Sequence, residues 1–251
     1  FAEGMSELCN LHSKTGVGES GEYLSSEFDR QVGLGMLGLA NLLRRYNVSY
    51  RDFGVALDQY IDGETIQSPA FALVDQFASG IRQAAAIARV NNMSRAFAIA
   101  PTASCSYRSQ DVDGFTCTPE IAPPISRTVD RDSGTFGVQT YNYGDVEVAS
   151  EVGWLDYTRV ADGIMVLLQQ TGLSHGYSYN SWSDVVTYDD QFIKTWLLGP
   201  QTSLYYSLQV MSDTQDKSNA YAALDEGDVD DYLASLFNES NTEPLTCDCQ
   251  E

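Results

Sequence analysis

Residues 97–106 read Phe97-Ala98-Ile99-Ala100-Pro101-Thr102-Ala103-Ser104-Cys105-Ser106, and the rest of the fold is organised around them. An apolar run suited to a buried strand ends at a proline, and five small residues follow, four of which carry a hydroxyl or a thiol. Such a break can leave several backbone N–H groups pointing at one spot, and a helix that starts there adds its own free N–H groups and its dipole to an anion site. The stretch therefore indicates either a phosphate-binding loop or a plain turn from strand to helix.

Composition narrows the class of protein. The 251 residues are 43% hydrophobic, enough to bury a core in one large domain or two small ones. A net charge of −21 argues against binding to nucleic acid or to an anionic membrane surface. No membrane-spanning run and no signal peptide are expected, and five scattered cysteines fit a reducing cytoplasm better than a disulfide framework.

Four segments in the first half of the chain have recognisable patterns. Residues 7–11 form a short apolar run that is compatible with a strand, with Cys9 near its middle. Residues 31–46 show helical spacing, although three glycines within them indicate close approach to a neighbouring element. Ser68 as N-cap and Pro69 at the first position predict a helix to about residue 91. Residues 107–142 form a long irregular segment, which we expect at the mouth of a site.

The second half predicts two further helices, a strand and a tail. The helices are expected over residues 155–170 and 188–198, and Thr202–Val210 alternates as a strand does. From residue 218 onward there are nine acidic residues and no Lys or Arg, which indicates a flexible acidic tail with one short helix at about 229–237. Helices alternating with short apolar strands indicate an α/β fold, and we expect a domain over residues 1–212 followed by a tail over 213–251.

Two local patterns suggest redox chemistry. Cys247-Asp248-Cys249 places two thiols near the end of the tail, where they could exchange with a disulfide in a pocket and then with an external reductant. The alternatives are an incidental pair or half of an intermolecular metal site. Tyr205 and Tyr206 are adjacent on the predicted strand, so their rings should point to opposite faces unless the backbone bends there. His12 and His175 are isolated and are expected to have structural roles.

Taken together, and in this order along the chain, these segments resemble the large, catalytic subunit of ribonucleotide reductase. Six segments carry the resemblance: Glu7–Leu11, Arg30–Ala40, Ala98–Ser106, Glu120–Pro124, Thr202–Tyr206 and the tail cysteines. The resemblance implies the C-terminal half of a ten-stranded α/β barrel, with Cys9 on a barrel strand. It implies that the substrate's phosphates are held by Pro101, Thr102, Ala103, Ser104, Cys105 and Ser106.

The resemblance also implies a mechanism and a set of partners. A radical generated in a separate metal-containing small subunit would pass through Tyr206 and Tyr205 to a cysteine that forms a thiyl radical. Cys9 and a partner cysteine would reduce a ribonucleoside di- or triphosphate, and Cys247 and Cys249 would then re-reduce that pair and be reduced by thioredoxin or glutaredoxin. No metal or cofactor is expected on this chain itself.

Several departures from the family pattern bear on this interpretation. The loop with the radical-bearing cysteine, the partner of Cys9 and the first half of the barrel are all missing, so we expect a companion chain to supply them. Ala103 stands where many relatives carry a polar or acidic residue, and the tail cysteines are separated by one residue where many relatives have more. Two alternatives stay open: an adenosylcobalamin-dependent reductase, and a non-catalytic remnant that binds another subunit.

Overall fold

The computed structural model describes residues 1–15, 27–132, 137–183, 197–199 and 203–209. Its elements, in chain order, are α1 (Ala2–Lys14), β1 (Gln31–Leu34), α2 (Leu39–Tyr46), α3 (Tyr50–Ile61), α4 (Pro69–Val90), β2 (Arg95–Ile99), α5 (Ala103–Ser106), β3 (Thr128–Asp132), β4 (Val138–Asn142), α6 (Ala149–Gln169), β5 (Ser174–Ser183) and β6 (Ser203–Gln209). The mixed α/β class predicted from the alternation of patterns is confirmed.

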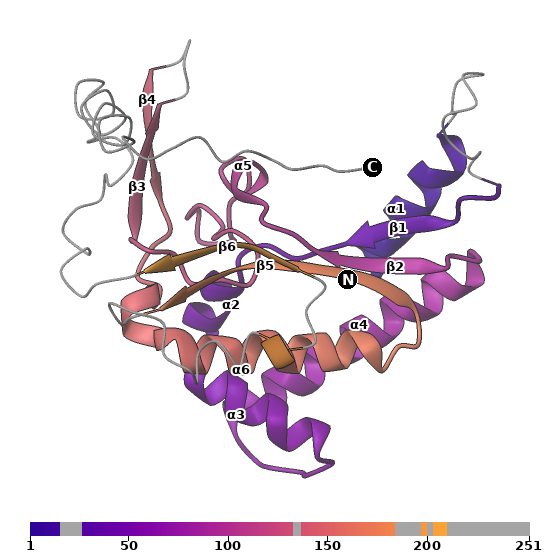
Figure 1. Cartoon of the computed structure of the whole chain (residues 1–251), viewed down its shortest axis with the longest axis horizontal. Coiled ribbons are helices and arrows are strands. Elements are labelled where there is room, and N and C mark those ends of the chain that lie inside the picture. Colours follow the sequence, from indigo (N-terminus) through magenta and orange to yellow (C-terminus); the bar gives the residue numbers. More distant parts are fainter. Residues whose placement is uncertain (16–26, 133–136, 184–196, 200–202, 210–251) are drawn as a thin grey trace, which may run out of the picture.

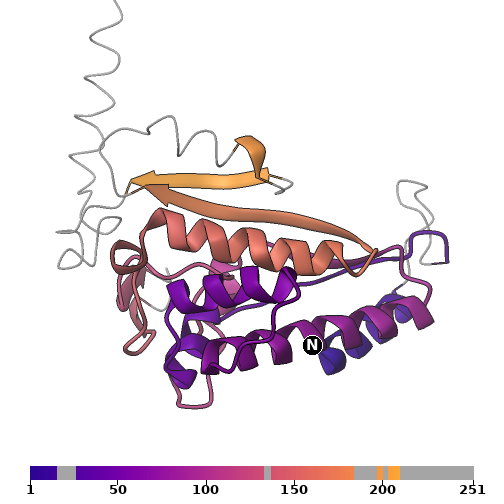
Figure 2. The same ribbon diagram turned by 90° about the horizontal axis from the view of Figure 1, so that it is seen from below.

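The main sheet has four parallel strands in the order β1-β2-β5-β6, so each strand is added beside its predecessor at the same edge. Helices α3, α4 and α6 pack together on one side of this sheet, and α5 and the β3–β4 hairpin lie on the other (Figures 1 and 2). The strands that the structure describes form an open sheet and a separate antiparallel pair, without a closed barrel.

Residues 7–11 belong to a helix, so the strand expected around Cys9 is wrong. Over the thirteen residues of α1, Met5 and Cys9 lie one turn apart and are buried, whereas Leu11 is 59% exposed. An apolar run of five residues is compatible both with the two-residue period of a strand and with the 3.6-residue period of a helix. Only a longer window shows that the helical period fits better. Helix α1 packs against α4 and β1. Gly4 lies next to the side chain of Leu34, and His12 Nε2 lies 2.6 Å from Asp29 O.

The single helix expected over residues 31–46 is also wrong, because the segment divides into β1 and α2. The glycines explain the division. A Cβ on Gly33 would lie 2.8 Å from Ala98 Cβ, and one on Gly35 would lie 2.5 Å from Ala98 O, so β1 and the residues after it approach β2 closely. Gly38 has φ +72°, a left-handed conformation that caps the start of α2. The predicted close approach is therefore confirmed, although it occurs between strands.

The helices on the core side follow their local signals. Ser68 Oγ accepts the N–H of Phe71 and Pro69 occupies the first turn of α4, as the sequence predicts. Helix α6 begins six residues before the expected start, but Gly153 is non-helical within it, so its regular part begins at the next residue. Helix α3, capped by Ser49, was not predicted.

The 107–142 segment is more regular than expected, because it ends in the β3–β4 hairpin, which pairs Thr128 with Asn142 and Asp132 with Val138. The strand expected at residues 202–210 is confirmed as β6. Most of the helix expected at 188–198, and all of the 213–251 tail with Cys247 and Cys249, lie outside the described residues. Among the helices that the structure describes, none is both long and apolar enough to cross a membrane.

Candidate functional site

The turn after β2 forms where the sequence predicts it. Strand β2 ends at Ile99, and Thr102 N–H donates to Ala100 O over 2.9 Å. The single helical turn α5 follows, closed by the Ser106 N–H, which donates to Thr102 O over 2.9 Å. Because the first N–H groups of a helical turn have no acceptor within it, this turn exposes donors at the carboxyl end of a parallel strand. Ser104 and Cys105 are exposed there, whereas Ser106 is fully buried.

A buried polar segment supports this turn from below. Thr118 and Glu120 are both 0% exposed, and the Glu120 N–H donates to Thr102 Oγ1 over 3.1 Å. Glu120 adopts φ +38°, which is uncommon for a residue other than glycine. The segment that follows is fixed by Tyr50, whose hydroxyl donates to Ile121 O over 2.9 Å. Thr102 is therefore hydrogen-bonded to a buried segment, and α3 holds that segment in place.

The same segment is attached to α2 by the buried side chain of Asn41. Its Oδ1 accepts the Thr118 N–H over 2.8 Å, and its Nδ2 donates to Thr116 O and Asp111 Oδ2, each over 3.0 Å. A longer bond of 3.3 Å reaches Tyr143 O, at the end of β4. One amide side chain thus joins α2, residues 111–118 and the hairpin.

Charged groups reinforce this attachment at the surface. Arg44, one turn after Asn41, lies 3.2 Å from Asp111 Oδ2 and 2.7 Å from Asp113 Oδ2, and its guanidinium stacks over the Phe115 ring. Burial alone would raise the pKa of Asp111, but the backbone N–H of Phe115, the Asn41 amide and Arg44 outweigh it and hold that pKa below its usual value. Asp111 is therefore a firm acceptor at neutral pH.

An aromatic cluster adjoins the turn on its other side. The rings of Tyr107, directly after α5, and Tyr141 of β4 have centroids 4.3 Å apart, and the Arg131 guanidinium lies 5.0 Å from the Tyr107 centroid. Tyr143 is 2% exposed, and burial, followed by the neighbouring Tyr107, raises its pKa well above the usual value. The cluster thus anchors the base of the hairpin next to the turn.

The strand register fixes how far Tyr205 and Tyr206 lie from the turn along the strand direction. Ile99 pairs with Tyr177 on β5, and the next β5 residue, Ser178, pairs with Ser203 on β6. Tyr205 and Tyr206 therefore lie roughly 10 Å beyond the end of β2. Strand β6 is two strands from β2, which corresponds to a lateral separation of roughly 10 Å.

The backbone of β6 is irregular at the pair itself. Tyr179 pairs with Leu204 and Ser181 with Ser207, so β5 advances by two residues while β6 advances by three. The extra residue lies at Tyr205–Tyr206, opposite Asn180. A bulge of this kind breaks the alternation that separates adjacent side chains in a regular strand.

The three cysteines that the structure describes are not gathered at the turn. Cys9 is buried on α1, where burial raises its pKa and Arg30 opposes that effect. Cys105 is exposed on α5 itself. Cys117 is half-buried, and burial and the charge of Asp111 raise its pKa, so both Cys9 and Cys117 are resting thiols at neutral pH.

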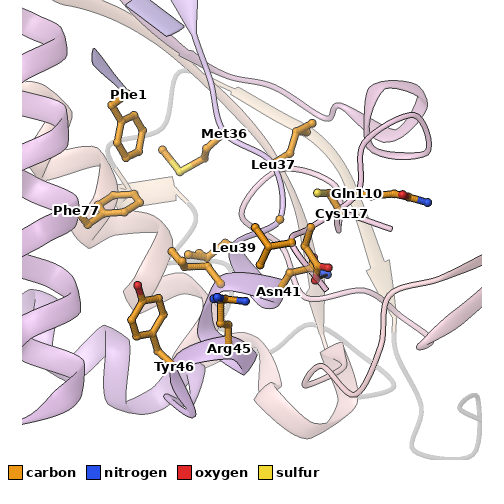
Figure 3. Close-up of a pocket in the computed structure, with 14 residues that line it drawn as sticks. Phe1, Met36, Leu37, Leu39, Asn41, Arg45, Tyr46, Phe77, Gln110 and Cys117 are labelled. Atoms are coloured by element: carbon orange, nitrogen blue, oxygen red, sulfur yellow. Dashed lines mark hydrogen bonds between the residues drawn. The ribbon is translucent and has the colours of Figure 1, made fainter. Parts of the chain in front are cut away.

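A cavity of about 470 Å³ lies between the start of α1, residues 36–46, α4 and residues 110–117 (Figure 3). Phe1 and Phe77 form an aromatic wall, edge to face with centroids 5.2 Å apart, and Arg45 and Tyr46 lie at its lower side in the view. Asn41 and Cys117 line the side away from Phe1 and Phe77. No pattern in the sequence indicates this cavity, because its walls come from segments that are remote from one another along the chain.

The sequence matches no family model, and the comparison with curated proteins finds no match. The interpretation of the site therefore depends on its residues and their geometry. Of the residues expected to act together, the 101–106 turn follows the end of β2, the Tyr205–Tyr206 backbone lies in the middle of β6, two strands away and roughly 10 Å further along the strand direction, and Cys9 lies on a separate helix. Asn41 and the tyrosine cluster were not predicted as parts of the site.

Proposed function

We propose that this chain is the C-terminal part of a ribonucleotide reductase large subunit and reduces ribonucleotides together with a companion chain. The observation that carries the proposal is the position of the 101–106 turn relative to the tyrosine pair in the sheet. The turn at 101–106 and the tyrosine pair are separated by about a hundred residues in sequence, yet the register of the parallel sheet places the tyrosine pair, in the middle of β6, roughly 10 Å beyond the carboxyl edge at which β2 leads into the turn. Ligands in parallel α/β folds bind at that edge.

In this proposal, residues 101–106 hold the phosphates of a ribonucleoside di- or triphosphate. The first-turn N–H groups of α5 and the exposed hydroxyl of Ser104 supply donors to the phosphate oxygens. The chain carries 35 acidic and 14 basic residues, so binding through backbone donors suits it better than binding through a cluster of cations. The buried segment with Thr118 and Glu120 holds the turn in a single conformation before the substrate binds.

Tyr206 and Tyr205 carry the radical in this proposal. Stepwise transfer between two tyrosines requires that their rings be close, and a regular strand would separate them. The bulge in β6 at this pair is the kind of backbone irregularity that such stacking requires, and it therefore supports the assignment. A small subunit that generates the radical is the implied partner, in preference to adenosylcobalamin.

The net reaction removes the 2′-hydroxyl of the ribose as water. Two electrons and two protons come from a pair of thiols, which becomes a disulfide, and the hydrogen first taken from the ribose by the thiyl radical is returned. Cys9 is proposed as one of the two thiols, and Cys247 and Cys249 as the dithiol that reduces the resulting disulfide. Because Cys9 lies on the buried face of α1 and is 3% exposed, this role requires that α1 move to expose the thiol.

The open sheet supports the need for a companion chain. Its strand order is the one that successive βα units produce in a barrel, and β1 and β6 are the edges of the described sheet. Such edges are sites for pairing with further strands. We propose that the companion completes a ten-stranded barrel and brings the radical-bearing cysteine, and that the enzyme acts in the cytoplasm.

Affinity capture tests the proposal. The full chain serves as bait in an extract of its native source, and mass spectrometry identifies what is recovered. We expect a polypeptide with an Asn-x-Cys-x-Glu loop and a small radical-generating subunit. Capture of full-length large subunits only, or of neither protein, would favour a non-catalytic remnant, and turnover with adenosylcobalamin and no second protein would favour the cobalamin-dependent class.

A further inference from the structure

Asn41 stands out because it is a buried polar side chain with partners far from it in sequence. It is 3% exposed in an otherwise leucine-rich helix, and its four hydrogen bonds reach residues 70 to 102 positions away. A buried amide of this kind costs free energy unless it is fully hydrogen-bonded. A leucine would fill the same place in the core of α2 without that cost, so packing alone does not explain the residue.

The hydrogen bonds continue from Asn41 to the turn after β2. Asn41 Oδ1 accepts the Thr118 N–H over 2.8 Å, and two residues later the Glu120 N–H donates to Thr102 Oγ1 over 3.1 Å. Thr102 O in turn accepts the Ser106 N–H that closes α5. Each link is a hydrogen bond or a covalent step, so the path has no gap.

The part of the path between Thr118 and Glu120 is stiff. Pro119 lies between them and fixes one backbone torsion. Gly38 N–H donates to Thr118 O over 2.8 Å, so α2 holds both sides of the Thr118 residue. We therefore expect a displacement of Thr118 to be passed on to Glu120.

We propose that Asn41 is a positioning residue that fixes Thr102, and with it the turn at 101–106, through residues 118–120. The functional meaning of this inference rests on the proposed function, in which that turn binds phosphates. The coupling itself is a property of this chain and can be measured without any ligand. A purely local role, in which Asn41 pins only residues 111–118, is the alternative that the test must exclude.

Amide hydrogen exchange of the full chain, resolved by NMR, provides the test. In Asn41→Ala we expect the amides of Thr118, Glu120 and Ser106 to exchange about tenfold faster or more, the effect of losing one buried hydrogen bond. Amides in the middle of α4 should keep their rates. Asn91→Ala is the matched control, because it removes a half-buried amide that donates to Ile87 O within its own helix end, and it should leave Ser106 unchanged.

A double-mutant comparison separates the proposed coupling from the local role. Thr102→Val removes the Oγ1 acceptor and nearly keeps the shape, so Asn41→Ala should accelerate Ser106 much less in that background. The proposal is overturned if Asn41→Ala accelerates Thr118 and leaves Ser106 unchanged, or if its effect on Ser106 is the same in both backgrounds.

A measurement on the natural chain covers the case in which Asn41→Ala does not fold. At low denaturant, the Thr118, Glu120 and Ser106 amides should open with one common free energy, as members of one cooperative unit. Opening of Ser106 well before Thr118 would contradict the coupling. Inorganic pyrophosphate then examines the proposed function separately. Protection of the Ser104 amide, in the exposed first turn of α5, supports phosphate binding, and its absence counts against phosphate binding while the exchange comparison still decides the coupling.

Discussion

Asp162 on α6 offers a sharp test of how a buried carboxyl makes the stability of the fold depend on pH. It sits at the crossing of α3 and α6, beside Gly163, where an added Cβ would lie 2.9 Å from Leu57 Cβ. Burial, and then the nearby charge of Asp58, raise the pKa of Asp162 from 3.8 to about 6. Its Oδ1 is buried and has no hydrogen-bond partner among the residues that the structure describes. The ionised carboxylate is therefore destabilised in the folded chain.

The sign of the effect follows from proton binding. Because the folded-state pKa of Asp162 is the higher one, the folded chain binds more protons than the unfolded chain between pH 3.8 and about 6. Its contribution to stability is fully present below pH 3.8 and is lost as the pH rises through about 6. A pKa difference of this size corresponds to at most about 3 kcal/mol, and partial solvent access reduces the expectation to about 1–2 kcal/mol.

Urea unfolding of the natural chain and of Asp162→Asn, measured from pH 4 to pH 7.5, checks this reasoning. We expect the variant to be more stable by about 1–2 kcal/mol at pH 7 and equal to the natural chain near pH 4. Asp156→Asn is the control on the same helix, since it breaks only a partly exposed ion pair with Arg159, and it should not produce that pH-dependent gain. A difference between Asp162→Asn and the natural chain that does not change with pH would refute the account.

Two further predictions concern the sheet and the tail. Gly35→Ala should destabilise the fold by about 2–3 kcal/mol, because the new Cβ would lie 2.5 Å from Ala98 O and a backbone atom cannot move aside without disturbing the sheet. Gly4→Ala is the control and should be tolerated, because its Cβ would meet only the end of a flexible side chain. Equal thermal unfolding temperatures for the two variants would contradict the close approach. Replacing both Cys247 and Cys249 by serine should spare reconstituted turnover with dithiothreitol and abolish it with thioredoxin, so equal activity with both reductants would remove the proposed shuttle.

The sequence predicts best those features that local chemistry decides. Ser68 and Pro69 start α4 because a cap and a proline act within one turn, and the change at Pro101 marks the end of β2 for the same reason. The prediction of a strand at residues 7–11 failed because five residues are too few to distinguish the spacing of apolar residues in a strand from that in a helix. The 31–46 prediction failed because Gly33 and Gly35 serve a contact with Ala98, which is remote in sequence.

The candidate site was predictable in its parts and not in its assembly. The 101–106 turn and the tyrosine strand were found from residue types, but their relative position depends on strand register. The bulge opposite Asn180 arises from the pairing of β5 with β6, which no pattern within Thr202–Val210 encodes. Asn41 resembles any surface asparagine in sequence, and only its buried partners reveal its place in the fold.

Turnover of the reconstituted enzyme tests the central claim most directly. The chain is combined with the companion polypeptide and the small subunit recovered with it, and formation of 2′-deoxyribonucleotide from cytidine di- and triphosphate is measured with the natural chain and with Tyr206→Phe. That substitution removes the phenolic proton and nearly keeps the shape. We predict product with the natural chain and none with the variant. Equal product from both would contradict the radical path, and no product from the complete natural complex would contradict the assignment as a ribonucleotide reductase.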